Sequence, residues 1–160
     1  MLDGEEAIRM AEAQPRLPPR WFVTSAWRVH RGLYAATRGR KGLWPPGGKR
    51  GWGAMRLTAV GRRSGEPRSV IVAYVEEGES LVTMSMNGWG EGDPAWWLNL
   101  QANPDAEVTT VDGNREVRAR EAHGEERERL WARFREYDPQ LDAYAAMRST
   151  PAAIVVLEPR

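Results

Sequence analysis

The segment from Gly61 to Arg68 combines the residue types that bind an anion. Two glycines bound a tight turn, and such a turn leaves backbone N–H groups unpaired and pointing outward, which favours a bound anion. Arg62, Arg63 and Ser64 would add charge-assisted hydrogen bonds. Arg68 follows on the next predicted strand, near enough to hold the same group. The pattern predicts a phosphate site, and the alternative is a charged hairpin whose glycines serve only the turn.

A second glycine-rich segment, Ser85 to Gly90, follows a predicted strand. Glycine allows a flat ligand to lie close to exposed backbone, although a plain flexible loop explains the same residues. Trp96 and Trp97 then begin a predicted helix. Because at most one of them is expected to face the core, the other could form the wall of a pocket. Packing of both at the core and its rim is the alternative.

Two tyrosines, Tyr137 and Tyr144, lie in the acidic C-terminal helical region. A tyrosine hydroxyl beside a reduced flavin-like ring could orient a substrate or donate a proton. Such a tyrosine is also typical of the rim of an amphipathic helix. His30 and His123 lack metal-ligand spacing, so both are interpreted as structural, and no metal site is expected. The absence of cysteine excludes thiolate chemistry and disulfides.

The sequence predicts that a mainly β fold positions these residues. From Ala54 the apolar residues alternate with polar ones, which indicates a strand. Short hairpin turns join successive strands, and this favours an antiparallel barrel with peripheral helices over a Rossmann fold. Strands are expected over 54–60, 68–75, 81–86, 107–111, 116–120 and 152–157. Helices are expected over 3–13, 21–37, 95–102, 125–137 and 141–147. Asp93 is expected to cap the helix that follows, with Pro94 at its first position.

The chain of 160 residues is expected to form one domain, in which residues 1–52 are a helical and basic N-terminal extension. Residues 1–70 carry 14 Lys and Arg against 5 Asp and Glu, whereas residues 71–160 carry 9 against 17. This basic block suggests an anionic partner (phosphate, nucleic acid or membrane surface) or a solvated face. Neither an apolar run of about 18 residues nor a secretory signal is found, so the cytoplasm is the expected compartment.

Three segments resemble the deazaflavin-dependent nitroreductase family, in the same order and spacing. Residues 57–68, LTAVGRRSGEPR, resemble its "LTTTGRKSGxPR" signature. Residues 93–104, DPAWWLNLQANP, resemble its "xPxWYxNLxANP" helix. MRSTP at 147–151, followed by IVVLEP at 154–159, resembles its closing segment. The resemblance covers about Arg28 to Pro159.

The resemblance implies an FMN-binding-like, antiparallel split β-barrel of the α+β class. It also implies coenzyme F420, a deazaflavin with a phosphodiester and an oligoglutamate tail, rather than FMN or FAD. The residues implied to hold its phosphate are Arg62, Arg63, Ser64, Gly65 and Arg68. Those implied to lie around its ring are Ser85, Met86, Asn87 and Gly88, with Trp96 and Trp97 from the next helix. Tyr144 matches a family tyrosine over the substrate.

The function implied is an F420H2-dependent reductase that passes hydride to a quinone, a nitroaromatic or an activated enone. A non-catalytic carrier of F420 or of another flavin-like ligand is the alternative. The family's ring-side loop usually carries a lysine near "SKGG", which is absent here, and Leu141 stands where some nitroreductases have a tyrosine. No nucleic-acid partner is expected, because that needs a broad basic surface. A homodimer and a peripheral membrane contact through the basic N-terminal region stay open.

Overall fold

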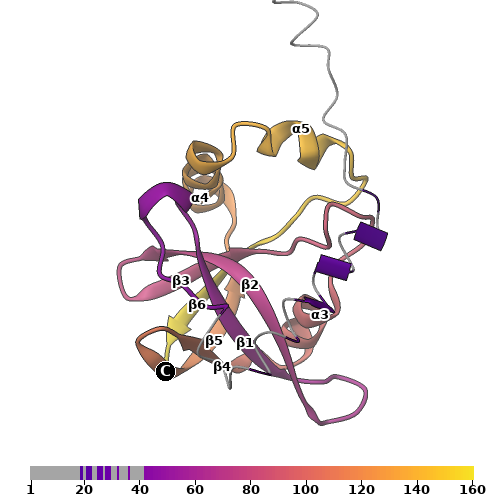
Figure 1. The fold of residues 1–160 in the computed structure, drawn as a ribbon, viewed down its shortest axis with the longest axis vertical. Helices are drawn as coiled ribbons and strands as arrows, with labels where there is room; N and C mark the ends of the chain where they lie inside the picture. Colours follow the sequence, from indigo (N-terminus) through magenta and orange to yellow (C-terminus); the bar gives the residue numbers. More distant parts are fainter. Residues whose placement is uncertain are drawn as a thin grey trace, which may run out of the picture.

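Six strands close into one antiparallel barrel in the computed structural model (Figure 1). The structure describes residues 42–160 and positions 19, 21, 22, 25, 26, 28, 29, 32 and 36. The strands are β1 (Gly53–Val60), β2 (Pro67–Glu77), β3 (Ser80–Met84), β4 (Asp105–Thr110), β5 (Gly113–Glu121) and β6 (Ile154–Pro159). Around the barrel they follow the order β1-β2-β3-β6-β5-β4, and β4 pairs back with β1.

The helices lie outside the barrel. They are α3 (Ala95–Ala102), α4 (Gly124–Tyr137) and α5 (Leu141–Ala146), with a short 3-10 turn, η1 (Gly48–Arg50). The described positions between 21 and 36 are all helical, as expected for 21–37, whereas the helix predicted over 3–13 lies outside the described residues. No helix among the described residues is long and apolar enough to span a membrane.

The core follows from the alternation of side chains along the strands. On β1, Met55, Leu57 and Ala59 point inward and are at most 4% exposed, so they fill the barrel interior. A second apolar cluster forms between the barrel and the helices. It takes Leu130 and Phe134 from α4, four residues apart on one helical face, and packs them with strand residues such as Val156.

Several element boundaries differ from the sequence-based predictions. β5 begins at Gly113 rather than 116, because Gly113 has a φ of 119° and pairs with Thr110 across a two-residue loop. The last strand begins at Ile154 rather than 152, and β3 ends at Met84 rather than 86. The predicted cap was also wrong by one residue. Pro94 has the extended backbone of an N-cap, and no side chain caps α3.

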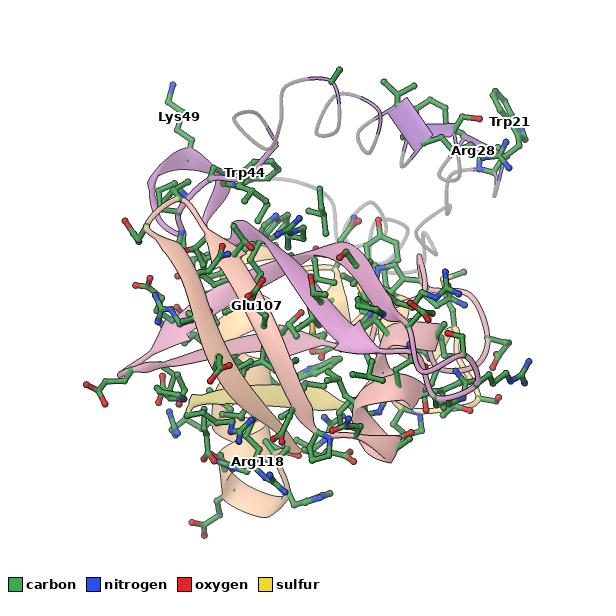
Figure 2. All side chains as sticks on the ribbon, turned by 90° about the horizontal axis from the view of Figure 1, so that it is seen from below. Trp21, Arg28, Trp44, Lys49, Glu107 and Arg118 are labelled. Atoms are coloured by element: carbon green, nitrogen blue, oxygen red, sulfur yellow. The ribbon has the colours of Figure 1, made fainter. Side chains whose placement is uncertain are left out.

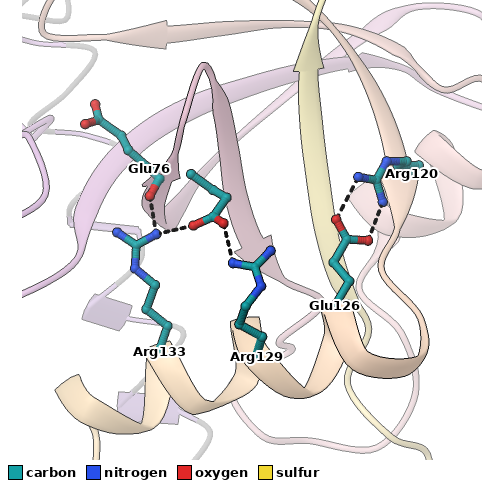
Figure 3. A network of polar contacts seen from close by, with 6 residues as sticks. Glu76, Arg120, Glu126, Arg129 and Arg133 are labelled. Carbon is teal, nitrogen blue, oxygen red and sulfur yellow. Dashed lines mark hydrogen bonds and ion pairs between the residues drawn. The ribbon is translucent and has the colours of Figure 1, made fainter.

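Arginines fasten α4 to the edge of the barrel (Figure 3). Arg129 and Arg133 both bind the carboxylate of Glu77 at the end of β2, and Arg133 also donates to the Glu76 carbonyl. At the start of α4, Arg120 of β5 forms a two-pronged pair with Glu126 at 2.7 and 2.8 Å. This contact holds the pKa of the Glu126 carboxyl below its usual value. Exposed pairs of this kind contribute about 0–1 kcal/mol each, so they orient α4 more than they stabilise it.

The segment before β1 folds back against the C-terminal end of α4. Trp44 pairs with Ala54, and its indole N–H donates to the Trp52 carbonyl at 3.1 Å. A Cβ on Gly51 would lie 2.3 Å from Cδ1 of the Tyr137 ring, so the two are in direct contact. Lys49, in contrast, points away from the barrel at this end of the molecule (Figure 2). Gly51 is therefore required by packing as well as by its φ of 75°.

We predict that Gly51→Ala destabilises the protein by about 2–5 kcal/mol, because it adds steric overlap with Tyr137 to a backbone penalty. Gly48→Ala is the matched control. Gly48 has a φ of 64° but nothing within 4 Å of the new methyl group, so it should cost only about 1–2 kcal/mol. Urea unfolding of both variants measures the difference. Equal losses would show that the contact with Tyr137 is not required.

Candidate functional site

The turn between β1 and β2 is held closed by its own backbone. Gly61 N–H donates to the Glu66 carbonyl and Gly65 N–H donates to the Gly61 carbonyl, both at 2.8 Å. Gly65 has a φ of 69°, and a Cβ on Gly61 would lie 2.7 Å from the Ser64 hydroxyl oxygen. Both glycines are therefore needed for the shape of the turn, because any side chain would strain or block it.

The turn leaves hydrogen-bond donors free for a ligand. Among the described residues, the backbone N–H groups of Arg63 and Ser64 have no acceptor. The Ser64 oxygen accepts from the Arg68 guanidinium at 3.4 Å and from Glu66 N–H at 3.3 Å, so its own hydrogen remains available. Arg63 and Arg68 are exposed, and neither forms an ion pair within the described part of the chain. A set made almost entirely of donors fits a phosphate group.

Helix α3 fixes the position of this turn. The side-chain oxygen of Asn99 accepts two hydrogen bonds from Arg62, one from the backbone N–H and one from the guanidinium, each at 3.1 Å. Asn99 is only 6% exposed, which is unusual for a polar side chain. Arg62 is therefore partly committed to holding the turn, while Arg63 and Arg68 keep their charge directed to solvent.

Residues 85–94 form the loop between β3 and α3. It is called the ring-side loop below, after the role predicted for it. Ser85 at its start is fully buried, and its hydroxyl oxygen accepts from Ala153 N–H at 2.7 Å. The same hydroxyl donates to the Asp93 carboxylate at 3.4 Å. The Ser85 side chain thus supports the loop from inside, and its place at the border of a ring stays a prediction. Of the other predicted ring-side residues, Met86 is half-buried, whereas Asn87 and Gly88 are exposed.

A buried arginine joins the two ends of this loop. Arg148 is 7% exposed and donates to the Ser85 carbonyl at 3.2 Å and to the Gly92 carbonyl at 2.8 Å. Beside it, the Glu91 carboxylate accepts from the hydroxyl of Ser149 at 2.7 Å and from its N–H at 3.0 Å. These bonds hold the pKa of the Glu91 carboxyl below its usual value. The segment after α5 therefore contacts the loop at both ends. These hydrogen bonds of Arg148 and Glu91 are called the clasp below.

The predicted catalytic tyrosine lies against the same loop. The ring of Tyr144 stacks on that of Trp89 with centroids 5.7 Å apart and an angle of 16° between the planes. The Tyr144 hydroxyl donates to the side-chain oxygen of Gln140 at 3.0 Å. The fold thus brings α5 and the ring-side loop together, as the assignment of Tyr144 requires.

The prediction that only one of Trp96 and Trp97 faces the core is wrong. They are 9% and 4% exposed, and both pack in the barrel cluster with residues such as Leu57 and Leu100. Their centroids lie 6.4 Å apart at an angle of 60°, so the two rings fill the core from adjacent directions. In this structure they anchor α3, and they serve the candidate site by fixing that helix.

Helix α3 therefore connects the two halves of the site. The ring-side loop ends where α3 begins at Ala95, and Asn99 contacts the turn one helical turn later. With a rise of about 1.5 Å per residue, these points lie roughly 6 Å apart along the helix axis. Figure 1 shows α3 on the outside of the barrel, with α4 and α5 above it. The arrangement therefore brings the donor-rich turn and the glycine-rich loop to the same helix.

A family model described as F420H(2)-dependent quinone reductase matches residues 26–159. The chain belongs to this family. The match agrees with the resemblance identified from the three sequence segments. Together with the closed six-stranded barrel, it confirms the prediction of an antiparallel split β-barrel with peripheral helices.

Individual relatives support the same assignment. An F420H(2)-dependent quinone reductase of Mycobacterium tuberculosis H37Rv is 29% identical over 136 residues, which cover 83% of this chain and 89% of that protein. A solved F420-H2 dependent reductase (FDR-A) is 29% identical with a TM-score of 0.60, over 66% of this chain and 93% of that one. Another structure, described as a domain-swapped dimer, is 27% identical with a TM-score of 0.63, over 88% and 100%.

Sequence reasoning assigned no role to three residues that organise the site. Asn99 and Arg148 both lie within segments quoted for the family resemblance, so the sequence pointed to their positions but not to their partners. Trp89 was visible only as one aromatic residue in a glycine-rich loop. Its contact with Tyr144 joins residues 55 positions apart, which no local pattern could indicate.

We predict that Arg148→Met destabilises the protein by about 1–3 kcal/mol, because two carbonyls lose a charged donor. Amide hydrogen exchange over residues 86–92 should also become faster, since the loop loses the contact that joins its ends. Arg118→Met, at an exposed position on β5, is the control and should leave the exchange of this loop unchanged. Unaltered exchange in Arg148→Met would show that the loop does not depend on this arginine.

Proposed function

We propose that this protein is an F420H2-dependent reductase that transfers hydride to an electrophilic small molecule. The observation that carries the proposal is α3, which ties a donor-rich anion turn to a loop next to a tyrosine. Family membership supports the choice of coenzyme, because the matching family is described by its use of F420H(2). When bound, the reduced deazaflavin supplies the hydride.

In this proposal the turn holds the phosphodiester of the coenzyme. The N–H groups of Arg63 and Ser64 and the Ser64 hydroxyl donate to its oxygens, while the guanidinium groups of Arg63 and Arg68 compensate its charge. Arg62 keeps the turn in place through Asn99. Gly65 supplies the left-handed backbone that the turn needs.

The ring-side loop orients the flat part of the coenzyme. Exposed backbone at Asn87 and Gly88 allows close approach, and Met86 offers an apolar surface beside it. Because no protein nucleophile or metal is needed for hydride transfer, the main task of the chain is to hold the two reacting carbons about 3–3.5 Å apart. The clasp made by Arg148 and Glu91 keeps the loop fixed for this purpose.

Tyr144 is the proposed source of the proton that the product takes up after hydride transfer. Its hydroxyl is oriented by Gln140, and its ring is held against Trp89. From this position the hydroxyl orients the substrate or donates a proton to the reduced product, with water as the other source.

The remaining expectations about partners extend this proposal. A relative of this chain is described as a domain-swapped dimer, which supports a homodimer here, and light scattering of the purified protein tests it. The predicted cytoplasmic location and the contact of the basic N-terminal region with a membrane surface remain predictions. Pelleting with anionic vesicles tests the membrane contact.

We predict that Arg68→Ala weakens F420 binding by about 10- to 150-fold, the loss of one charged hydrogen bond of roughly 1.5–3 kcal/mol. Binding to the wild type should also weaken as salt rises, since exposed charges are screened within about 8–10 Å. Tryptophan fluorescence follows both titrations, with Arg118→Ala as the control. A dissociation constant that is the same in Arg68→Ala and in the wild type would remove this residue from the site.

We predict that Tyr144→Phe slows reduction of a quinone by at least about tenfold, because the hydroxyl is lost while the ring remains stacked on Trp89. Binding of F420 should change less than twofold. Deazaflavin absorbance measures the rate, and Tyr137→Phe, whose ring packs on Gly51, is the control. If F420 binds tightly but neither protein speeds reduction of any acceptor, the carrier function replaces the reductase function.

A further inference from the structure

Trp89 occupies a backbone conformation that side chains rarely adopt. Its φ of 58° makes it the one residue other than glycine with a positive φ among those the structure describes. Gly88 beside it has a φ of 56° and Gly92 one of 78°. The other two positions of this loop with a positive φ are therefore occupied by glycine. A tryptophan at such a position costs energy that glycine would not. The presence of tryptophan here therefore indicates that the indole ring is needed for packing or for binding.

The contacts of Trp89 indicate what the ring is needed for. The ring packs on the second apolar cluster, as Met86 does, but it also lies nearly parallel to the ring of Tyr144, with an angle of 16° between the planes. Core packing alone does not require a parallel arrangement. Both rings are only half-buried, so they offer an aromatic surface that includes the proposed proton donor, Tyr144. The clasp formed by Arg148 and Glu91 holds this surface in place.

The charges around Trp89 restrict the ligands that this surface can take. Hydrogen bonds from Ser149 lower the pKa of the Glu91 carboxyl, and the Asp93 carboxylate accepts a hydrogen bond from Ser85 at the end of the same loop. Two nitrogens of Arg148 donate hydrogen bonds to backbone carbonyls. Arg148 keeps its positive charge, because carbonyls do not neutralise it, but it is buried beneath the loop. The two carboxylates outnumber this one cation, so the loop repels an anionic substrate more than a neutral one. A neutral and planar molecule fits it best.

We infer that Trp89, together with Tyr144, binds the electron acceptor by stacking, and that Trp89 is the residue that makes the protein discriminate flat acceptors from puckered ones. This inference rests on the proposed reductase function and adds a residue that determines substrate class. An aromatic ring gains from offset stacking on an indole, whereas a puckered enone ring has no flat face to offer. Trp89 acts on the acceptor and not on the coenzyme.

The test compares two acceptors in three variants. Menadione is the flat acceptor and cyclohexenone the puckered one, and the variants are Trp89→Phe, Trp89→Leu and Trp52→Leu. Trp52 is the matched control, because it is also half-buried against the second apolar cluster but lies at the end of β1 opposite the anion turn. KM and kcat are measured with reduced F420, and the dissociation constant of oxidised F420 is measured separately.

A second readout does not depend on turnover. The chain has eight tryptophans, so ¹⁵N-labelled indole groups give a small set of NMR signals in which Trp89 is assigned by its loss in Trp89→Phe. Titration of the wild type with menadione should shift the Trp89 signal and leave that of Trp52 unchanged. This experiment reports on the proposed surface even if the protein proves to be a carrier.

We expect Trp89→Leu to raise KM for menadione at least tenfold, with less than a twofold change for cyclohexenone and for F420 binding. Trp89→Phe should keep most of the affinity for menadione, and Trp52→Leu all of it. If Trp89→Leu does not fold, the NMR titration and Trp89→Phe decide. An unshifted Trp89 signal, or equal effects of Trp89→Leu on the two acceptors, overturns the inference. Absence of turnover with a shifted Trp89 signal contradicts the reductase function alone.

Discussion

Arg62 donates two hydrogen bonds to a single atom, the side-chain oxygen of the buried Asn99. This contact ties the hairpin between β1 and β2 to α3, and α3 is in turn held in the barrel by Trp96 and Trp97. Without it, the turn would be held only by the pairing of β1 with β2 and by its own backbone bonds, and it would have no direct contact with α3 through Asn99. In the proposed site, the position of the phosphate turn relative to α3 therefore depends in part on one amide side chain.

The barrel and the C-terminal segment provide the second constraint. Strands β3 and β6 pair directly, so the loop after β3 and the residues before β6 leave the barrel side by side. Ser85 and Ala153 bond each other through backbone and side chain at this point. Arg148 and Glu91 then extend the connection outward to the loop. The ring-side loop is therefore held at both ends, although it is rich in glycine.

Much of this architecture is readable from the sequence, because it is encoded locally. The alternation on β1 and the glycines of its hairpin are enough to predict the strands and the turn between them. Both tryptophans of α3 pack inward, which a one-face view of the helix could not anticipate, since α3 is covered on more than one side. The buried contact of Ser85 with Ala153 could not be anticipated for a related reason, because it joins residues 68 positions apart and follows from the pairing of β3 with β6.

The central claim is that α3 fixes two things together: Asn99 in its middle holds the turn proposed to bind the phosphate, and its first residue follows the loop proposed to border the ring. Amide NMR of the ¹⁵N-labelled protein tests it most directly, with F420 compared against the same deazaflavin lacking its phosphodiester. The account predicts that F420 shifts the amides of Arg63 and Ser64 together with those of residues 86–92. The compound without phosphate should shift only the loop and bind more weakly. Equal affinity of the two compounds, with the Arg63 and Ser64 amides unshifted by F420, would contradict the account.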